Sequence, residues 1–304
     1  MSQASSDSSA RRAEASASAQ PAPETRLIRV AHSPDADDAF MFYALATGKV
    51  ATPGLKFTHV LADIETLNQA AREELYDVTA LSFYAYGFLH HQYLLLDCGA
   101  SFGEGYGPAL VASHLLKRDD LARRRIAVPG LWTTGYLVLK LWAPEIEAVP
   151  MAFDKILDAV REETVDAGLL IHEGQLLFPQ YGLHRIVDLG QWWLAETGLP
   201  LPLGGNAIRR ALGVELGRQV ARALRQSVAF GLEHREAALS YAMQFARDLD
   251  EHLADRFVGM YVNRWTLGYG ERGRQAVREL LRRAHQAALL PEAVEPEFLT
   301  EEEP

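Results

Sequence analysis

The sequence is poor in cysteine, in long apolar runs and in positive charge. Its 304 residues include one cysteine, Cys98, which excludes an internal disulfide and a cysteine-based metal cluster. No stretch reaches the roughly 18 uninterrupted apolar residues of a membrane span, so we expect no membrane partner. The formal net charge of −10 argues against a nucleic-acid partner, because such surfaces need basic patches to neutralise phosphates. These absences favour a globular protein of a reducing compartment.

The first 26 residues differ in composition from the rest of the chain. They consist mainly of Ser, Ala, Gln, Glu and Pro, so we predict a disordered polar tail over 1–26. The pair Arg11-Arg12 is typical of a twin-arginine export signal, but no apolar run follows it. We therefore expect no export signal and a cytoplasmic location.

The remaining chain has the length and the composition of a two-lobed α/β protein. Hydrophobic residues make up 48% of the sequence, and the length allows two lobes of about 100–150 residues. Short apolar runs alternate with helical patterns, and the strand–helix–strand order after residue 125 is typical of a parallel sheet. Extended segments near 109–113 and 198–206 suit crossings between lobes. The predicted division is 27–109 plus 206–304 for lobe 1, with C-terminal helices near 214–232, 235–248, 250–265 and 271–288, and 110–205 for lobe 2.

A short apolar run over 167–171 ends in His172, Glu173 and Gly174. The run is too short for a helix and predicts a buried strand, after which Gly174 permits a tight turn. Ligands of open α/β sheets bind at the C-terminal ends of strands. Because the ordinary pKa of histidine is about 6.5, His172 can take or give a proton near neutral pH. The alternative is a core histidine bonded to a neighbouring carbonyl group.

The segment 32–38 joins a predicted strand to a predicted helix and carries three aspartates. Ser33 or Asp35 can cap the helix. Helix N-termini usually bind anions, but the aspartates would repel phosphate and better suit a hydroxyl-bearing ligand such as a sugar. Ser33, Asp37 and Asp38 are therefore candidate substrate contacts. The alternative is that the aspartates only favour the helix dipole.

Polar residues also mark a third and a fourth place. Ser82, with Phe83 and Tyr84, ends the strand predicted over 77–82. Thr133 and Thr134 begin a predicted helix, where hydroxyls and free backbone amides together suit a carboxylate. Plain capping of the helix is the alternative for the threonines. A glycine-rich dinucleotide fingerprint and a paired-histidine metal spacing are both lacking, so we expect no cofactor and no metal.

Together, these segments resemble the family of 1,4-dihydroxy-6-naphthoate synthases, which act in the futalosine route to menaquinone. The likeness runs from about Leu27 to the C-terminus and is specific through the combination of motifs. One departure is that some relatives carry Ser-Pro-Cys-Pro-Asn-Asp where this chain has Ser-Pro-Asp-Ala-Asp-Asp, so a thiol there is not needed. The segments are AHSPDADDAFMFYAL (31–45), LSFYAYG (81–87), GYGPALVAS (105–113), IAVPGLWTTGYLVLKL (126–141), GLLIHEGQLLF (168–178) and DLGQWWLAETGLPLPLGGNAIRR (188–210).

The resemblance implies a fold like the type II periplasmic binding proteins, with mixed sheets flanked by helices. It implies a lyase that converts cyclic dehypoxanthine futalosine to 1,4-dihydroxy-6-naphthoate and releases a sugar-derived fragment. It also implies that His172 is the proton acceptor. The substrate contacts that it implies are Ser82, Phe83, Tyr84, Thr133, Thr134 and Gly135.

Other functions fit parts of the same pattern. A solute-binding protein of a transport system has the same two-lobed architecture, and fold alone cannot separate it from an enzyme. The expected lack of an export signal and of a lipid-attachment cysteine weighs against it. Chorismate dehydratase, the sister enzyme of the pathway, is similar in fold, but the IHEG-like motif and the LPLGG segment favour the naphthoate synthase. A ligand sensor has no positive support in the sequence.

Overall fold

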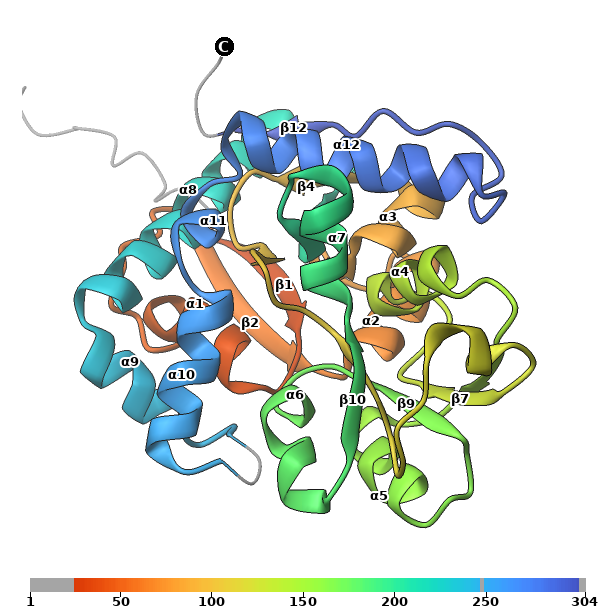
Figure 1. The fold of residues 1–304 in the computed structure, drawn as a ribbon. Coiled ribbons are helices and arrows are strands. Elements are labelled where there is room, and N and C mark those ends of the chain that lie inside the picture. The colour runs from red at the N-terminus through yellow and green to blue at the C-terminus, as the bar shows by residue number, and fades with distance from the viewer. Residues whose placement is uncertain (1–24, 247–248, 301–304) are drawn as a thin grey trace, which may run out of the picture.

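Two β-sheets form the centre of the molecule (Figure 1). The computed structural model describes residues 25–246 and 249–300, so the tail predicted for 1–26 lies almost wholly outside the described residues. The larger sheet has seven strands in the order β12-β4-β11-β3-β1-β2, with β5 paired to β11. Its strands are β1 (Arg26–His32), β2 (Leu55–Leu61), β3 (Val78–Ser82), β4 (Tyr93–Leu96), β5 (Ser101–Gly103), β11 (Leu201–Arg209) and β12 (Phe298–Leu299).

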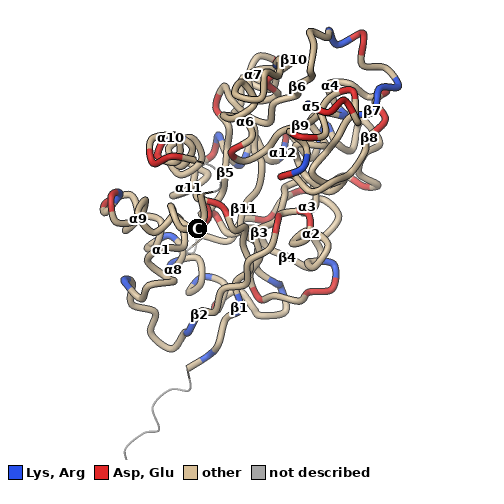
Figure 2. Tube along the Cα trace, turned by 90° about the horizontal axis from the view of Figure 1, so that it is seen from below, with Lys and Arg blue, Asp and Glu red and all other residues tan. Residues whose placement is uncertain are grey.

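The smaller sheet has five strands in the order β10-β6-β9-β7-β8. Figure 2 shows the strands of this sheet grouped apart from those of the larger one. Side chains on both faces of its central strand are buried, which explains the continuous apolar run before His172. The strands are β6 (Ala109–Ala112), β7 (Arg125–Val128), β8 (Glu147–Pro150), β9 (Ala167–Leu170) and β10 (His184–Asp188).

Both sheets are mixed. In the smaller sheet β7, β8 and β9 are parallel, as the strand–helix–strand order predicted, but β6 and β10 are antiparallel to their neighbours. The parallel strands predicted after residue 125 are thus present, within the mixed sheet that the resemblance implied.

Helices cover the sheets, and most begin and end where the sequence predicts. Aspartates cap α1, α2, α7 and α10 through their side chains, and Gly198 ends α7 in the left-handed conformation with φ +70°. The helices are α1 (Ala36–Ala46), α2 (Ile64–Arg72), α3 (Phe83–Leu89), α4 (Thr134–Trp142), α5 (Ile156–Arg161), α6 (Gly174–Leu177), α7 (Leu189–Thr197), α8 (Val214–Glu233), α9 (Arg235–Ala242), α10 (Glu251–Tyr261), α11 (Arg264–Leu267) and α12 (Gly270–Gln286).

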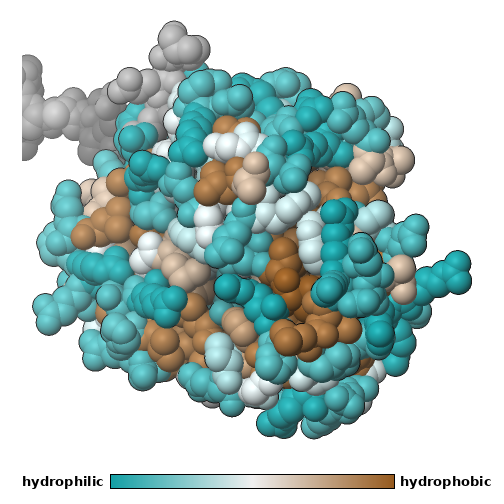
Figure 3. All heavy atoms as spheres, viewed as in Figure 1, coloured by the Kyte–Doolittle hydropathy of each residue, from teal (hydrophilic) through white to brown (hydrophobic). Residues whose placement is uncertain are grey.

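The C-terminal helices pack on the larger sheet through apolar stripes. In α12 the buried positions recur at three- and four-residue spacing, as the sequence pattern predicts. The helix predicted over 235–248 ends earlier, at Ala242. Residues 247 and 248 of the predicted range lie outside the described residues. Within 25–246 and 249–300, each helix is too short or too polar to cross a membrane. The face drawn in Figure 3 is mostly hydrophilic, with small apolar patches between polar groups.

The chain passes between the two sheets through the loop before β6 and again through β11. The loop and the start of α7 approach closely, because a Cβ at Gly190 would lie 1.9 Å from the carbonyl oxygen of Tyr106. Strand β11 begins at Leu201 within the larger sheet, a few residues before the boundary predicted at 205.

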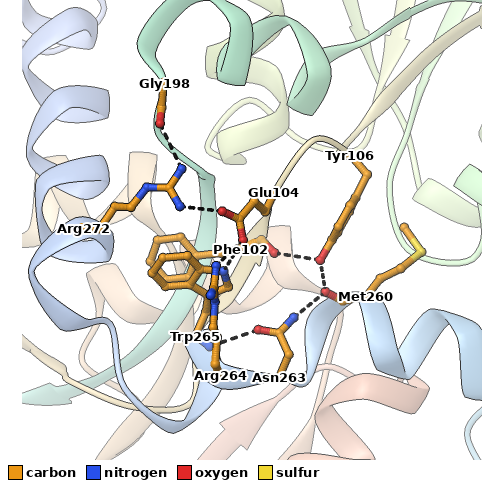
Figure 4. A network of polar contacts seen from close by, with 9 residues as sticks. All are labelled: Phe102, Glu104, Tyr106, Gly198, Met260, Asn263, Arg264, Trp265 and Arg272. Atoms are coloured by element: carbon orange, nitrogen blue, oxygen red, sulfur yellow. Dashed lines mark hydrogen bonds and ion pairs between the residues drawn. The ribbon is translucent and has the colours of Figure 1, made fainter.

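A polar network fixes the first of these connections to the C-terminal helices (Figure 4). The carboxylate of Glu104 accepts hydrogen bonds from Arg264 at 2.6 Å and from Arg272 at 2.5 Å. Arg272 also donates to the carbonyl oxygen of Gly198 at 3.0 Å, next to the second connection. The hydroxyl of Tyr106 donates to the carbonyl oxygen of Met260. Both connections are thus tied to the same helical segment.

Candidate active site

A cavity lies where the edges of the two sheets meet. It encloses about 740 Å³ of unfilled space, including solvent at its mouth. Its walls come from the turn before α1, the end of β3, the start of α4, the turn after β9, and β11. The predicted site residues that line it are Ser33, Asp37, Asp38, Ser82, Thr133, Thr134, Gly135 and His172.

Phe83 and Tyr84 are the two predicted contacts that the structure places elsewhere. Helix α3 begins at Phe83, and the helical turn directs its ring into the core, where it packs against Phe102 and Tyr269. The hydroxyl of Tyr84 donates to the carbonyl oxygen of Leu289 at 2.9 Å. Neither side chain lines the cavity. Both side chains serve the packing behind Ser82, and the predicted contact of Phe83 and Tyr84 with substrate stays a prediction.

His172 lies in the turn between β9 and α6. Its Nδ1 is 2.9 Å from Oδ2 of Asp35, and the two side chains are 16% and 6% exposed. Its φ of +51° is in the left-handed region, which is uncommon for a residue other than glycine. Phe153 packs against the imidazole with ring centroids 4.9 Å apart. Such restraint on one histidine at a cavity wall is typical of a functional position.

The carboxyl groups around His172 shift one another's pKa values in opposite directions. Burial alone lowers the pKa of His172, but the charge and the hydrogen bond of Asp35 raise it above the ordinary value, with help from Glu173 and Asp38. Burial raises the pKa of Asp35, but His172 and further hydrogen bonds lower it below its usual range. Burial, together with the charge of Asp35, raises the pKa of Asp37 and of Asp38 well above the ordinary value. The cluster therefore pairs Asp35, whose charged form is favoured, with two carboxyl groups whose protonated form is favoured.

Asp38 and Asp37 differ in the hydrogen bonds that their carboxyl oxygens form. Oδ2 of Asp38 accepts a hydrogen bond from the backbone N–H of Ser33 at 2.7 Å, which fixes the turn before α1. Oδ1 of Asp37 is buried and has no hydrogen-bond partner among the described residues. Of the two, Asp37 therefore has the freer polar atom toward the cavity.

Ser82 is the last residue of β3, and Asn68 fixes its hydroxyl by a hydrogen bond. The side chain of Asn68, on α2, donates to the Ser82 hydroxyl at 3.1 Å and accepts from the Ser82 backbone N–H at 3.0 Å. Because the hydroxyl accepts from Asn68, its own proton remains available to a ligand in the cavity. Asn68 was not among the residues predicted from the sequence.

The two threonines at the start of α4 have different roles. Thr133 is the cap: its hydroxyl accepts from the N–H of Tyr136 at 3.2 Å and donates to the carbonyl oxygen of Gly130 at 2.9 Å. Thr134 instead accepts from the N–H of Tyr84 at 3.2 Å, which leaves its hydroxyl proton unused. Helical geometry also leaves the first amides of α4, at Thr134 and Gly135, without partners inside the helix.

Three cavity residues were missed as site residues. Asn206 donates to the carbonyl oxygen of Gly99 at 2.7 Å, and its buried Oδ1 has no partner among the described residues. Gln175, one turn after His172, contacts Tyr261 of α10 at 2.7 Å. Oriented to satisfy both of its ends, the Gln175 amide also accepts from the N–H of His172 at 3.2 Å. Polar type and closeness to His172 were available signals for Gln175, whereas nothing local marked Tyr261.

Two groups of side chains have ligand atoms within 4.8 Å of one another, a spacing at which a cation can be shared. One group, His90, His91 and Glu292, is on the surface away from the cavity. The other comprises Asp35, Asp37 and His172, but Asp35 and His172 bond directly to each other. We therefore describe the second group as a hydrogen-bonded acid–base cluster.

Comparisons with known proteins agree with the resemblance found in the sequence. The chain matches the family described as "Menaquinone biosynthesis" over residues 28–286. A relative from Thermus thermophilus, named 1,4-dihydroxy-6-naphthoate synthase, is 41% identical over 272 residues, which cover 90% of this chain and 99% of the relative. A relative of the same name from Streptomyces coelicolor is 39% identical over 271 residues, covering 87% and 95%.

Solved structures show the same fold. A crystal structure of a protein from Archaeoglobus fulgidus has a TM-score of 0.83 at 50% identity, covering 86% of this chain and 98% of that one. A Candida albicans protein described as having the generic periplasmic-binding-protein fold has a TM-score of 0.65 at 14% identity, covering 88% and 92%. The periplasmic-binding-protein-like α/β fold is thereby confirmed. With the family match and the relatives above, the chain belongs to the menaquinone biosynthesis family.

Proposed function

We propose that this chain is a lyase that converts cyclic dehypoxanthine futalosine to 1,4-dihydroxy-6-naphthoate, with His172 as the proton acceptor. The observation that carries the proposal is the setting of His172. Its Nδ1 is engaged by Asp35, its side chain lines the cavity, and no hydrogen bond of its Nε2 is found among the described residues. The names of the two relatives supply the reaction class.

The chemistry needs a base and a means to stabilise negative charge. Forming the aromatic ring removes a proton and builds up an enolate as the sugar-derived fragment leaves. One positioned base typically contributes about 10²–10⁴-fold to the rate. His172 supplies the base, and the carboxyl groups of Asp37 and Asp38, which hold protons, supply hydrogen bonds to developing or existing oxygens. The raised pKa of both carboxyl groups supports this role.

Another part of the cavity wall suits the carboxylate of a bicyclic acid. The hydroxyl protons of Ser82 and Thr134 are unused. The first backbone amides of α4, at Thr134 and Gly135, lie at the helix end that lines the cavity. The apolar lining contributed by Ile64, Ile171 and neighbouring residues suits a flat ring system. A carboxylate held at one end would present the opposite end of the substrate to His172.

Asp37, Asp38 and Ser33 line the same cavity, and we place the sugar-derived part of the substrate beside them. A carboxyl group that holds a proton both donates and accepts, which matches the hydroxyl groups of a sugar. Asn206, with its unpartnered oxygen, adds an acceptor for one further hydroxyl.

We also propose that the two sheets are the cores of two lobes, 27–109 plus 206–304 and 110–205, which close over the substrate. The cavity between the sheets and the two connections support this division. Closure of two lobes would exclude water from the reacting atoms. We place the reaction in the cytoplasm, without a cofactor, as expected from the sequence.

The direct test is incubation of the purified chain with cyclic dehypoxanthine futalosine, followed by chromatographic detection of the naphthoate. We expect product from the wild type and its near absence with His172→Ala. Parallel incubation with chorismate tests the sister dehydratase activity. Binding of the futalosine compound without any turnover would instead favour a solute-binding role and refute the proposal.

A further inference from the structure

Asp35 and His172 follow strands of different sheets, and their side chains are in contact at the cavity. Asp35 lies in the turn after β1, and His172 in the turn after β9. Their side chains are joined by the 2.9 Å contact between Oδ2 and Nδ1, and both are largely withdrawn from solvent. The sequence marked Asp35 only as a helix cap. The contact gives it a second partner that no local pattern predicts.

The carboxylate of Asp35 is fixed before it reaches His172. Its Oδ1 accepts a hydrogen bond from the N–H of Asp38 at 3.3 Å, which caps α1. Oδ1 is thus held by the helix and Oδ2 by the imidazole, and the carboxyl group of Asp37 also hydrogen-bonds to this carboxylate. A carboxylate held in this way is a rigid acceptor, since its rotamer is set by the helix.

This contact determines which nitrogen of His172 can act. When Nδ1–H donates to Asp35, the lone pair of the neutral ring is on Nε2. The left-handed φ of His172 and the ring of Phe153 restrict the imidazole further. A histidine whose one nitrogen donates to a carboxylate while the other takes a proton is the arrangement of known catalytic dyads and triads.

We propose that Asp35 is a positioning residue for the reaction, which fixes the tautomer and the orientation of His172 so that Nε2 takes the substrate proton. The inference rests on the proposed role of His172 as the base and extends it to a second residue. The proton moves from a substrate carbon to Nε2, and the electron pair of that C–H bond enters the developing ring. Asp35 stays ionised and stabilises the imidazolium that forms.

The carboxyl groups facing His172 all favour its protonated form. They are Asp35 from the turn before α1, Asp38 from the first turn of α1, and Glu173 beside His172 itself. Asp37 also lies close, and the raised pKa of Asp37 and of Asp38 favours the protonated form of both over a wider range of pH than for Asp35. Among these groups, Asp35 alone is joined to the imidazole by the 2.9 Å contact.

The variant Asp35→Asn tests the proposal sharply, because an amide has a single acceptor oxygen. That oxygen serves either the N–H of Asp38 or Nδ1–H of His172. If the cap is kept, the amide NH₂ faces Nδ1 and forces the proton onto Nε2, the wrong tautomer. The matched control is Asp63→Asn, since Asp63 caps α2 by accepting from the N–H of Thr66 at 3.0 Å and has no histidine partner.

For Asp35→Asn we expect kcat to fall by about 10²-fold or more while KM changes little, since a comparable tautomer change in serine proteases costs about 10⁴-fold. The acid limb of the kcat profile should move to lower pH, because a base that loses its carboxylate partner has a lower pKa. Asp63→Asn should keep the wild-type kcat and profile. Equal losses of kcat in both variants would attribute the effect to capping and overturn the proposal.

A second readout is independent of activity. In ¹⁵N NMR spectra of the wild type, we expect the neutral ring of His172 to carry its proton on Nδ1, with the signal assigned by its loss in His172→Gln. The opposite tautomer would overturn the proposal. In Asp35→Asn the titration midpoint of His172 should fall by about one pH unit or more, and an unchanged midpoint would also count against it. If these signatures are present but the wild type makes no naphthoate, the proposed function fails while the pairing stands.

Discussion

The hydroxyl of Tyr261 and the side chain of Gln175 form a 2.7 Å hydrogen bond between α10 and the segment that carries His172. Tyr261 is 3% exposed, and burial raises the pKa of its hydroxyl far above the ordinary value, so the neutral form is strongly favoured. Together with the Asp35–His172 pair, this contact gives the turn after β9 two polar attachments to the helices of the larger sheet. The position of the proposed base therefore depends on residues far apart in the sequence.

Replacing Tyr261 with phenylalanine removes one of these attachments. The change leaves the Gln175 amide in a largely dry place with a lost partner, so we expect the free energy of unfolding to fall by about 1–2 kcal/mol. Urea denaturation followed by circular dichroism measures this difference. An unchanged midpoint would show that Gln175 finds another partner at no cost.

His172→Ala should leave a folded protein with kcat reduced by at least about 10²-fold. The loss follows from removal of the base, whereas contacts at the carboxylate end of the cavity remain. Steady-state kinetics on cyclic dehypoxanthine futalosine measures it. His91→Ala is the control, because His91 is an exposed histidine outside the cavity lining. Near-normal turnover by His172→Ala would remove this residue from the mechanism.

The adjacent threonines of α4 should separate by their effects. Thr134→Val removes a hydroxyl proton offered to the substrate, so we expect KM to rise by about tenfold or more. Thr133→Ala removes the helix cap and should lower stability by about 1 kcal/mol with little change of KM. Paired measurement of KM and of thermal melting distinguishes the two. If KM were the same in both variants, helix capping would be the better explanation for the role of both threonines.

Asp37→Asn should stabilise the protein more at pH 8 than at pH 5. Burial and the charges of Asp35 and Asp38 raise the pKa of Asp37 well above the ordinary value, so the folded state binds its proton more tightly than the unfolded state does. Stability from this group is present at low pH and is lost as pH rises through the folded-state pKa, and each pH unit between the folded and unfolded pKa values corresponds to about 1.4 kcal/mol. Because asparagine cannot ionise, the variant does not lose this stability as the pH rises. Melting curves of both proteins at the two pH values test it, and a pH-independent difference would contradict the raised pKa of Asp37.

Local patterns predicted most of the elements and the histidine because these depend on neighbouring residues. The apolar run at 167–171 became β9 over Ala167–Leu170, and the aspartate turn became the start of α1. Eight of the ten predicted site residues line the cavity, since strand ends and helix starts gather there. This part of the site follows from the fold class alone.

What the sequence left open depends on contacts between distant segments. Asp35 could be recognised as a cap, but its contact with His172 joins residues that 136 intervening positions separate in the chain. Phe83 and Tyr84 follow Ser82 directly, yet the onset of α3 turns them away from the cavity. Mixed sheets were expected, but which strands run antiparallel stayed open, because strand direction depends on how the chain returns, which periodicity does not encode.

The place of β11 in the larger sheet has a consequence for synthesis on the ribosome. This strand lies between β3 and β4, although the chain reaches it only at residue 201, after all five strands of the smaller sheet have been made. The inserted half can therefore assemble as the nascent chain emerges, while the first five strands, β1 to β5, wait for their shared partner. A nascent chain whose residue 190 has just left the ribosome would carry a finished smaller sheet beside an unfinished larger one.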